Sequence, residues 1–186
     1  MNAEDLEKID SKKMCQTYDK WPEIAKNGFD GDFKKFDVKG IDHIVFSGMG
    51  GSGSIGDVIS AILSKEDIHV SNVKGYHLPK TVDSNSLVVA TSISGNTKET
   101  LAVLEKAQKT DAKIAVFSSG GMIQKFSKTN NLFFQEISMI HSPRASFPKF
   151  LFAILNILKE IIPIKKTSVE EAFSSLEITR NNIFSN

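Results

Sequence analysis

Between residues 41 and 134 the chain alternates short apolar runs with segments whose apolar residues recur every three or four positions. The runs are continuous, as in strands that are buried on both faces of a parallel sheet, and the segments between them have helical spacing. The predicted strands cover residues 44–46, 68–73, 87–90, 114–117 and 132–134. This alternation predicts an α/β fold, a doubly wound five-stranded parallel sheet with helices on both faces.

The N-terminal part of the chain, residues 1–38, has the pattern of a helical arm. Asp10 and Ser11 are suited to cap a helix that contains Met14 and Trp21, and Pro22 is suited to begin a second helix. We expect this arm to pack against the sheet domain or against a second subunit.

Two further helices are predicted after the last strand. Residues 147–162 form a strongly apolar helical pattern that ends at Pro163. Ser168 and Glu171 have the spacing of a capping box and predict an amphipathic helix over residues 168–184. The apolar helix and the N-terminal arm carry more hydrophobic surface than one sheet covers, so we expect a partner surface.

Two turns rich in glycine and hydroxyl groups follow the first and third predicted strands. They cover residues 47–54 (SGMGGSGS) and 91–97 (TSISGNT). The carboxyl ends of parallel strands meet at one edge of the sheet, where ligands bind in such folds. Backbone N–H groups, hydroxyls and a helix N-terminus at each turn suit a phosphate group. The two turns therefore predict one shared anion site.

The second turn distinguishes phosphate binding from plain helix capping. Ser92, Ser94 and Thr97 place three hydroxyls beside Gly95, whereas a cap needs only one. The two additional hydroxyl groups favour phosphate binding, and simple helix capping is the alternative.

The first turn matches the glycine pattern of dinucleotide sites through Gly48, Gly50 and Gly53. The acidic residue that such sites carry after the second strand is missing, which makes a dinucleotide site the weaker interpretation.

Composition narrows the function classes. The 186 residues are 40% hydrophobic and 24% charged with a net charge of +1, which fits a soluble domain and gives no footprint for nucleic acid. The single cysteine, Cys15, excludes an internal disulfide and fits a reducing cytoplasm. Residues 1–5 lack the apolar core of a secretory signal, and the apolar stretch 150–158 is too short to cross a membrane. No cysteine and histidine spacing suits a metal, and we expect no cofactor.

Three segments together resemble a known family. Residues 92–100 (SISGNTKET) look like the phosphosugar-binding signature of sugar isomerase (SIS) domains. Gly-Gly-Ser at 50–52 and Ser-Pro-Arg at 142–144 narrow the resemblance to bifunctional phosphoglucose/phosphomannose isomerases, over roughly residues 40–160. The resemblance implies a flavodoxin-like sheet that binds a hexose 6-phosphate. It also implies an SIS domain over 39–162 and a helix at 163–186 that leads to a second SIS domain.

The resemblance also assigns roles to individual residues. It implies that Arg144 stabilises the negative charge of a cis-enediolate during conversion of glucose or mannose 6-phosphate to fructose 6-phosphate. The implied substrate-binding residues are Gly50, Gly51, Ser52, Ser92, Ser94, Gly95, Asn96 and Thr97.

A general base for this isomerisation is not evident in the sequence. In the family that the chain resembles, the glutamate, histidine and lysine that move protons come from a second SIS domain, with the histidine from the partner subunit. Asp57, Glu136 and His141 are local candidates, but ordinary surface and loop roles suit them better. We therefore expect a phosphate-binding half of an isomerase, nearly inactive alone and completed by a homodimer or a second SIS domain. A non-catalytic sugar-phosphate sensor is the alternative.

Overall fold

The computed structural model describes residues 8–184 and contains a five-stranded sheet in which all strands are parallel. The strand order is β2-β1-β3-β4-β5, which confirms the predicted doubly wound, flavodoxin-like fold. The expectation for residues 1–5 lies outside the described residues. The strands are β1 (His43–Ser47), β2 (His69–Val73), β3 (Ser86–Ser92), β4 (Lys113–Ser118) and β5 (Phe133–Glu136).

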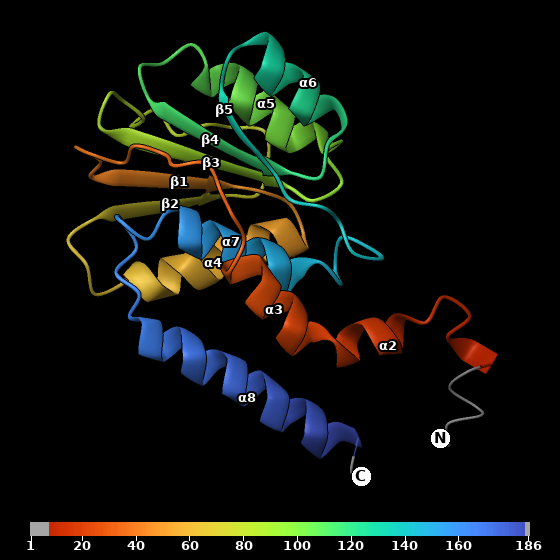
Figure 1. The fold of residues 1–186 in the computed structure, drawn as a ribbon. Helices are drawn as coiled ribbons and strands as arrows, with labels where there is room; N and C mark the ends of the chain where they lie inside the picture. Colours follow the sequence, from red (N-terminus) through yellow and green to blue (C-terminus); the bar gives the residue numbers. More distant parts are fainter. Residues whose placement is uncertain (1–7, 185–186) are drawn as a thin grey trace.

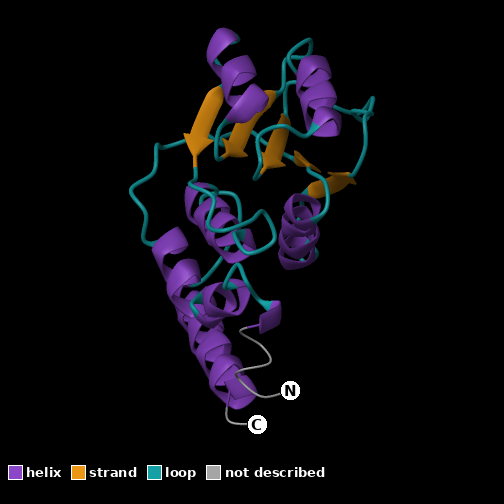
Figure 2. Ribbon diagram, turned by 90° about the vertical axis from the view of Figure 1, so that its right-hand side faces the viewer, coloured by secondary structure: helices purple, strands orange, loops and turns teal. Residues whose placement is uncertain are grey.

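Helices cover both faces of the sheet (Figure 2). One face packs against α4 (Gly51–Leu63) and α7 (Phe147–Ile157), and the other packs against α5 (Lys98–Ala107) and α6 (Gly121–Thr129). Every residue of β1 and β3 is buried, whereas the outer strands β2 and β5 are only partly covered. Burial on both faces explains why the central strands read as continuous apolar runs.

The strand β3 is longer than the predicted run 87–90, because it continues through Thr91 and Ser92. Both residues are polar and buried, at 3% and 0% exposure. The sequence pattern assigned them to the following turn, since it treats hydroxyl residues as turn formers. In the structure they are the last two residues of the strand, so the hydroxyl of Ser92 is fixed by the sheet.

A further helical layer lies over α7 (Figure 1). It consists of α2 (Met14–Asp19), α3 (Trp21–Phe29) and α8 (Lys166–Phe184). Gly28 lets α3 approach α7 closely, because a Cβ there would lie 2.6 Å from the carbonyl oxygen of Lys149. On α8, Phe173 packs with its ring centroid 4.9 Å from that of Phe152 in α7.

Two helix predictions near the C-terminus were wrong in detail. The apolar helix α7 ends at Ile157 and is followed by turns, so it does not reach residue 162. Ser168 does not cap the last helix, because α8 begins at Lys166 and the N–H of Ser168 donates to the carbonyl of Lys165. Propensity rules fix helix ends only to within a few residues.

The hydrophobicity of α7 gives no reason to expect a second subunit. Its side chains Phe150, Ala153 and Ile154 are fully buried at 0% exposure within this chain. The covering comes from α3, α4 and α8. Within residues 8–184, no helix combines the length and apolar character that a membrane crossing needs.

His43 at the start of β1 is a buried titratable group, 5% exposed. Its Nε2 lies 3.1 Å from the hydroxyl of Ser71, its Nδ1 lies 3.4 Å from that of Ser86, and its ring centroid is 4.6 Å from that of His69. Burial, followed by the neighbouring His69, lowers the pKa of His43. The carbonyl of Thr81 and the carboxylates of Asp83 and Asp42 act in the opposite direction.

This environment predicts a loss of stability in mild acid. The unfolded chain takes up a proton on residue 43 near pH 6.5, and the folded chain does so only at lower pH. The free energy of unfolding should therefore fall as the pH drops below about 6.5, by at most about 1.4 kcal/mol per pH unit for this one group. Urea unfolding at pH 7.5 and 5.5 measures the effect. His43→Gln should reduce the difference, and an unchanged difference would exclude His43 as the cause.

Candidate functional site

The carboxyl edge of the sheet brings both predicted turns together. The turn after β1 leads into α4, and the turn after β3 leads into α5. Within the described residues, no side-chain hydrogen bond caps α4 or α5. The first three N–H groups of α5, residues 98–100, have no acceptor in the described part of the chain, whereas in α4 the N–H groups of Ser52 and Gly53 donate to the carbonyl of Met49 at 3.1 and 3.3 Å. The dipole of α5 therefore favours an anion at its open N-terminus.

The hydroxyls of the second turn are not used to cap α5. Thr97 is the N-cap residue, but its Oγ1 lies 2.8 Å from the Oγ of Ser92. Ser92 also accepts a hydrogen bond from the N–H of Gly95 at 3.1 Å. Ser94 is exposed at the rim of the turn. The geometry thus disfavours the capping alternative and leaves Ser94 and Thr97 beside an open helix N-terminus.

The first turn is tied to the second by a hydrogen bond. The Oγ of Ser52 accepts from the N–H of Ile93 at 3.3 Å. Gly50 and Gly51 are exposed, and Gly50 has a φ of 53°. Packing accounts for part of the glycine pattern, because a Cβ on Gly53 would lie only 2.7 Å from the carbonyl oxygen of Gly48. These glycines therefore need no dinucleotide to explain them.

The turn after β4 packs directly on the turn after β3. Gly95 has a φ of 73°, and a Cβ built on it would overlap the carbonyl of Gly120. Conversely, a Cβ on Gly121 would lie 2.6 Å from the carbonyl oxygen of Gly95. The carboxamide Oδ1 of Asn96 accepts from the N–H of Met122 in the first turn of α6 at 3.1 Å. The side chain of Asn96 therefore joins the two turns, and its backbone N–H lies 3.5 Å from the Oγ of Ser94.

Arg144 lies in the connection from β5 to α7, residues 137–146, which is on the same side of the molecule as the carboxyl ends of the strands (Figure 1). Its side chain is exposed and forms no hydrogen bond or ion pair within residues 8–184. Both α4 and α7 begin at this edge and pack against each other. The turn at Gly50–Ser52 lies at the start of α4 and Arg144 lies just before α7, so both lie at the same ends of two helices that pack against each other.

The local candidates for a base all have other partners. Asp57 forms an ion pair with Lys74 at 2.6 Å, and Glu136 accepts from Gln124 at 3.0 Å. The Nε2 of His141 lies 2.8 Å from the carbonyl oxygen of Lys12. In the described part of the chain, no group of three or more His, Cys, Asp or Glu residues could hold a metal ion.

Sequence reasoning missed several polar groups near this edge. Ser47 ends β1 and Thr100 lies in the first turn of α5, and both hydroxyls are buried without a partner in residues 8–184. The carboxylate of Glu99 in α5 lies beside the hydroxyl of Tyr76 and raises the pKa of that hydroxyl. Ser47, Glu99 and Thr100 lie in the segments 47–54 and 92–100 described from the sequence above, but none of the three was given a role there, and Tyr76 lies outside both segments.

The fold and the two turns define a domain class, and comparison with known proteins identifies it. The family model described as the SIS domain matches residues 39–139. The chain belongs to the SIS domain family.

Curated relatives have sugar-phosphate names. The chain is 33% identical to the bifunctional phosphoglucose/phosphomannose isomerase of Thermoplasma acidophilum over 83% of its own length and 46% of the relative's. It is 33% identical to the same enzyme of Aquifex aeolicus over 84% and 48% of the two lengths. It is 30% identical to the D-glucosamine-6-phosphate 4-epimerase of Sulfolobus acidocaldarius over 79% and 46%. The chain thus spans about half the length of these relatives.

Solved structures support the fold alone. The C-terminal domain of glucosamine-fructose-6-phosphate aminotransferase from Francisella tularensis superposes with a TM-score of 0.66 at 17% identity, over 90% of this chain and 54% of that one. Glucosamine-6-phosphate deaminase from Thermotoga maritima gives a TM-score of 0.66 at 15% identity, over 87% and 52%.

The glycine contact between the turns makes a stability prediction. Gly95→Ala should lower the free energy of unfolding by about 3 kcal/mol or more, because the new methyl group meets backbone and the φ is positive. Gly75→Ala is the matched control, since a Cβ there has open space around it. Urea denaturation of both variants measures the difference. Equal stability of the two variants would contradict the packing described for Gly95.

Proposed function

We propose that the cradle formed by the turns after β1 and β3 binds the phosphate group of a hexose 6-phosphate. The observation that carries the proposal is the contact of 2.8 Å between the Ser92 and Thr97 hydroxyls, which leaves the N-terminus of α5 without a side-chain cap. Neutral hydroxyls and helix N–H groups suit a phosphate dianion. The names of the relatives, which refer to phosphoglucose, phosphomannose and glucosamine 6-phosphate, agree with this ligand class.

The proposed reaction is an aldose–ketose isomerisation through a cis-enediolate. The phosphate would contact Ser94, Thr97 and the backbone N–H of Asn96, while the buried Ser92 would act by holding the hydroxyl of Thr97. The sugar would lie along Gly50, Gly51 and Ser52. Arg144 is suited to stabilise the enediolate, since a guanidinium stays charged and does not take up the proton that moves.

The proposed general base lies outside this chain's anion cradle. Asp57, Glu136 and His141 are engaged by Lys74, Gln124 and Lys12 respectively. We propose that residues 39–162 act as the substrate-phosphate domain of a cytoplasmic enzyme of carbohydrate metabolism. In this proposal, residues 1–38 form the arm and the C-terminal segment 163–186, which contains α8, leads to a second SIS domain. That domain or a partner subunit supplies the base.

A sugar-phosphate sensor is a second candidate. A sensor would use the same cradle and would need no general base. This agrees with the observation that Asp57, Glu136 and His141 each interact with another residue. Binding measurements support both functions equally, whereas proton exchange on the substrate separates them.

Ser94→Ala tests the phosphate assignment. Loss of one hydroxyl that faces a charged phosphate should weaken fructose 6-phosphate binding about tenfold, as measured by titration calorimetry. Ser174→Ala is the control, because this exposed serine lies on α8 and its hydroxyl bonds only the carbonyl of Glu170. Equal affinities of the Ser94→Ala chain and the wild-type chain would refute the assignment.

Turnover by this chain alone is expected to be near background. Removal of a general base lowers isomerisation by a factor of roughly a hundred to ten thousand. Incorporation of solvent deuterium at C2 of glucose 6-phosphate, followed by NMR, measures the proton transfer directly. Rapid incorporation that depends on Arg144 would show that a base is present in these 186 residues.

A further inference from the structure

The loop that carries Arg144 is hydrogen-bonded to residues 8–29 of the N-terminal arm. The indole Nε1–H of Trp21 donates to the carbonyl oxygen of Ala145 at 3.0 Å, across 124 positions of sequence. The Nε2 of His141 donates to the carbonyl of Lys12 at 2.8 Å. His141 has a φ of 55°, a conformation that persists in a non-glycine residue only where the surroundings fix it. The arm therefore fixes this loop on both sides of Arg144.

The backbone around Arg144 is also fixed from within the loop. The buried hydroxyl of Ser146 accepts from the N–H of Ile140 at 2.7 Å and donates to the carbonyl of Ser142 at 2.8 Å. Ala145 and Ser146 are both 0% exposed. In contrast, the guanidinium of Arg144 is exposed and has no partner among the described residues. The loop thus combines a rigid backbone with one cation that is free to take an anion.

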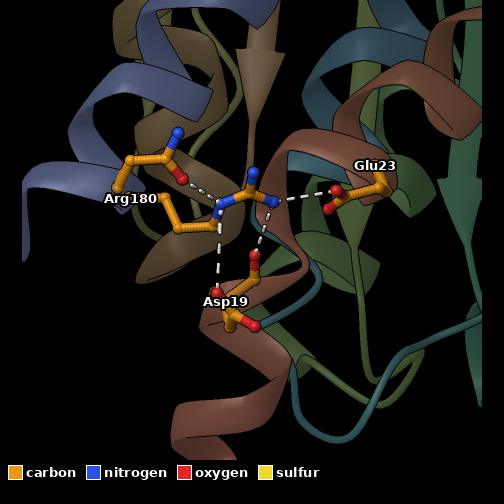
Figure 3. Close-up of polar contacts among 4 residues, drawn as sticks. Asp19, Glu23 and Arg180 are labelled. Carbon is orange, nitrogen blue, oxygen red and sulfur yellow. Dashed lines mark hydrogen bonds and ion pairs between the residues drawn. The ribbon is translucent and has the colours of Figure 1, made fainter. Parts of the chain in front are cut away.

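The arm itself is anchored on the domain. Gly28 gives α3 its close backbone approach to α7. At the N-terminal end of α3, Nη1 of Arg180 in α8 lies 2.8 Å from the carboxylate of Glu23, and Nε lies 3.9 Å from that of Asp19 (Figure 3). The ring of Tyr18 packs edge-on against Trp21 with centroids 4.9 Å apart. Contacts within the layer of α2, α3 and α8 therefore hold Trp21 in place independently of its hydrogen bond to the loop.

We propose that Trp21 is a positioning residue, whose indole N–H holds the Ala145 carbonyl and so directs Arg144 toward the sugar end of a bound hexose phosphate. This inference rests on the proposed function, because it gives Arg144 a ligand. A small displacement of a charged group from its reacting atoms costs a large part of its effect. The hydrogen bond between Trp21 and Ala145 does not involve the phosphate cradle. Loss of this bond should therefore affect binding at the sugar end of the ligand and leave binding of the phosphate end unchanged.

The test compares two ligands with the full chain by titration calorimetry. Inorganic phosphate probes the cradle alone, and 5-phosphoarabinonate adds a carboxylate that imitates the charge of an enediolate. Trp21→Phe keeps an aromatic ring and removes the N–H. It should weaken 5-phosphoarabinonate binding about fivefold, the value of one hydrogen bond, and leave phosphate binding unchanged. Arg144→Gln should weaken the same ligand about tenfold or more.

A double-mutant cycle decides whether Trp21 acts through Arg144. In the Arg144→Gln chain, the added Trp21→Phe change should have no further effect on either ligand. A further loss there, an equal loss for both ligands, or no loss in Trp21→Phe alone would each overturn the inference. Tyr18→Phe, which keeps the ring against Trp21, is the control and should bind as the wild type does.

A second variant tests the other bond if Trp21→Phe does not fold. Asparagine tolerates positive φ but is too short to reach Lys12, so His141→Asn should show the same selective loss for 5-phosphoarabinonate. A loss for both ligands would again overturn the inference. If the wild-type chain binds neither ligand, the proposed function itself fails. If it binds both and only the selectivity is absent, the proposed function stands and the role of Trp21 does not.

Discussion

The close approach of Gly95 to Gly120 and Gly121 sets the geometry of the carboxyl edge. Two backbone segments meet there with no room for a side chain on either, so the turns after β3 and β4 form one unit. Asn96 completes the unit by accepting a hydrogen bond from the first turn of α6. This contact gives the N-terminus of α6 an acceptor from within the protein, and the carbonyl of Met49 does the same for α4. The N-terminus of α5 is left without such an acceptor in the described residues.

In the proposed function, anion recognition is a local property of the cradle. The net charge is only +1, so long-range attraction contributes little. The positive potential at the cradle comes from helix N-termini and oriented N–H groups, which fall off within about one turn. A ligand with a compact dianion therefore gains more here than an extended, singly charged one. The same reasoning disfavours nucleic acid, which needs a broad basic surface.

Hydrophobic periodicity predicted the sheet, because the central strands are buried on both faces and leave continuous runs. It also placed both turns at the carboxyl edge of the sheet. The length of β3 was not predictable, since Thr91 and Ser92 are buried by tertiary contacts that no local pattern carries. The capping box at Ser168 was wrong for the related reason that α8 begins at Lys166, two residues before the predicted cap. The pairing of Trp21 with Ala145 joins positions 124 apart and has no local signature at all.

The candidate site is supported by two mechanically different parts of the molecule. The phosphate cradle is built on buried strands, so its geometry depends on the sheet. The Arg144 loop lies outside the sheet and depends on hydrogen bonds to an arm that is itself held by α7 and α8. Changes in the arm should therefore reach the arginine without reaching the cradle. This separation allows the energy of phosphate binding to be measured apart from the stabilisation of charge at the sugar, since one part of the fold can be altered while the other stays in place.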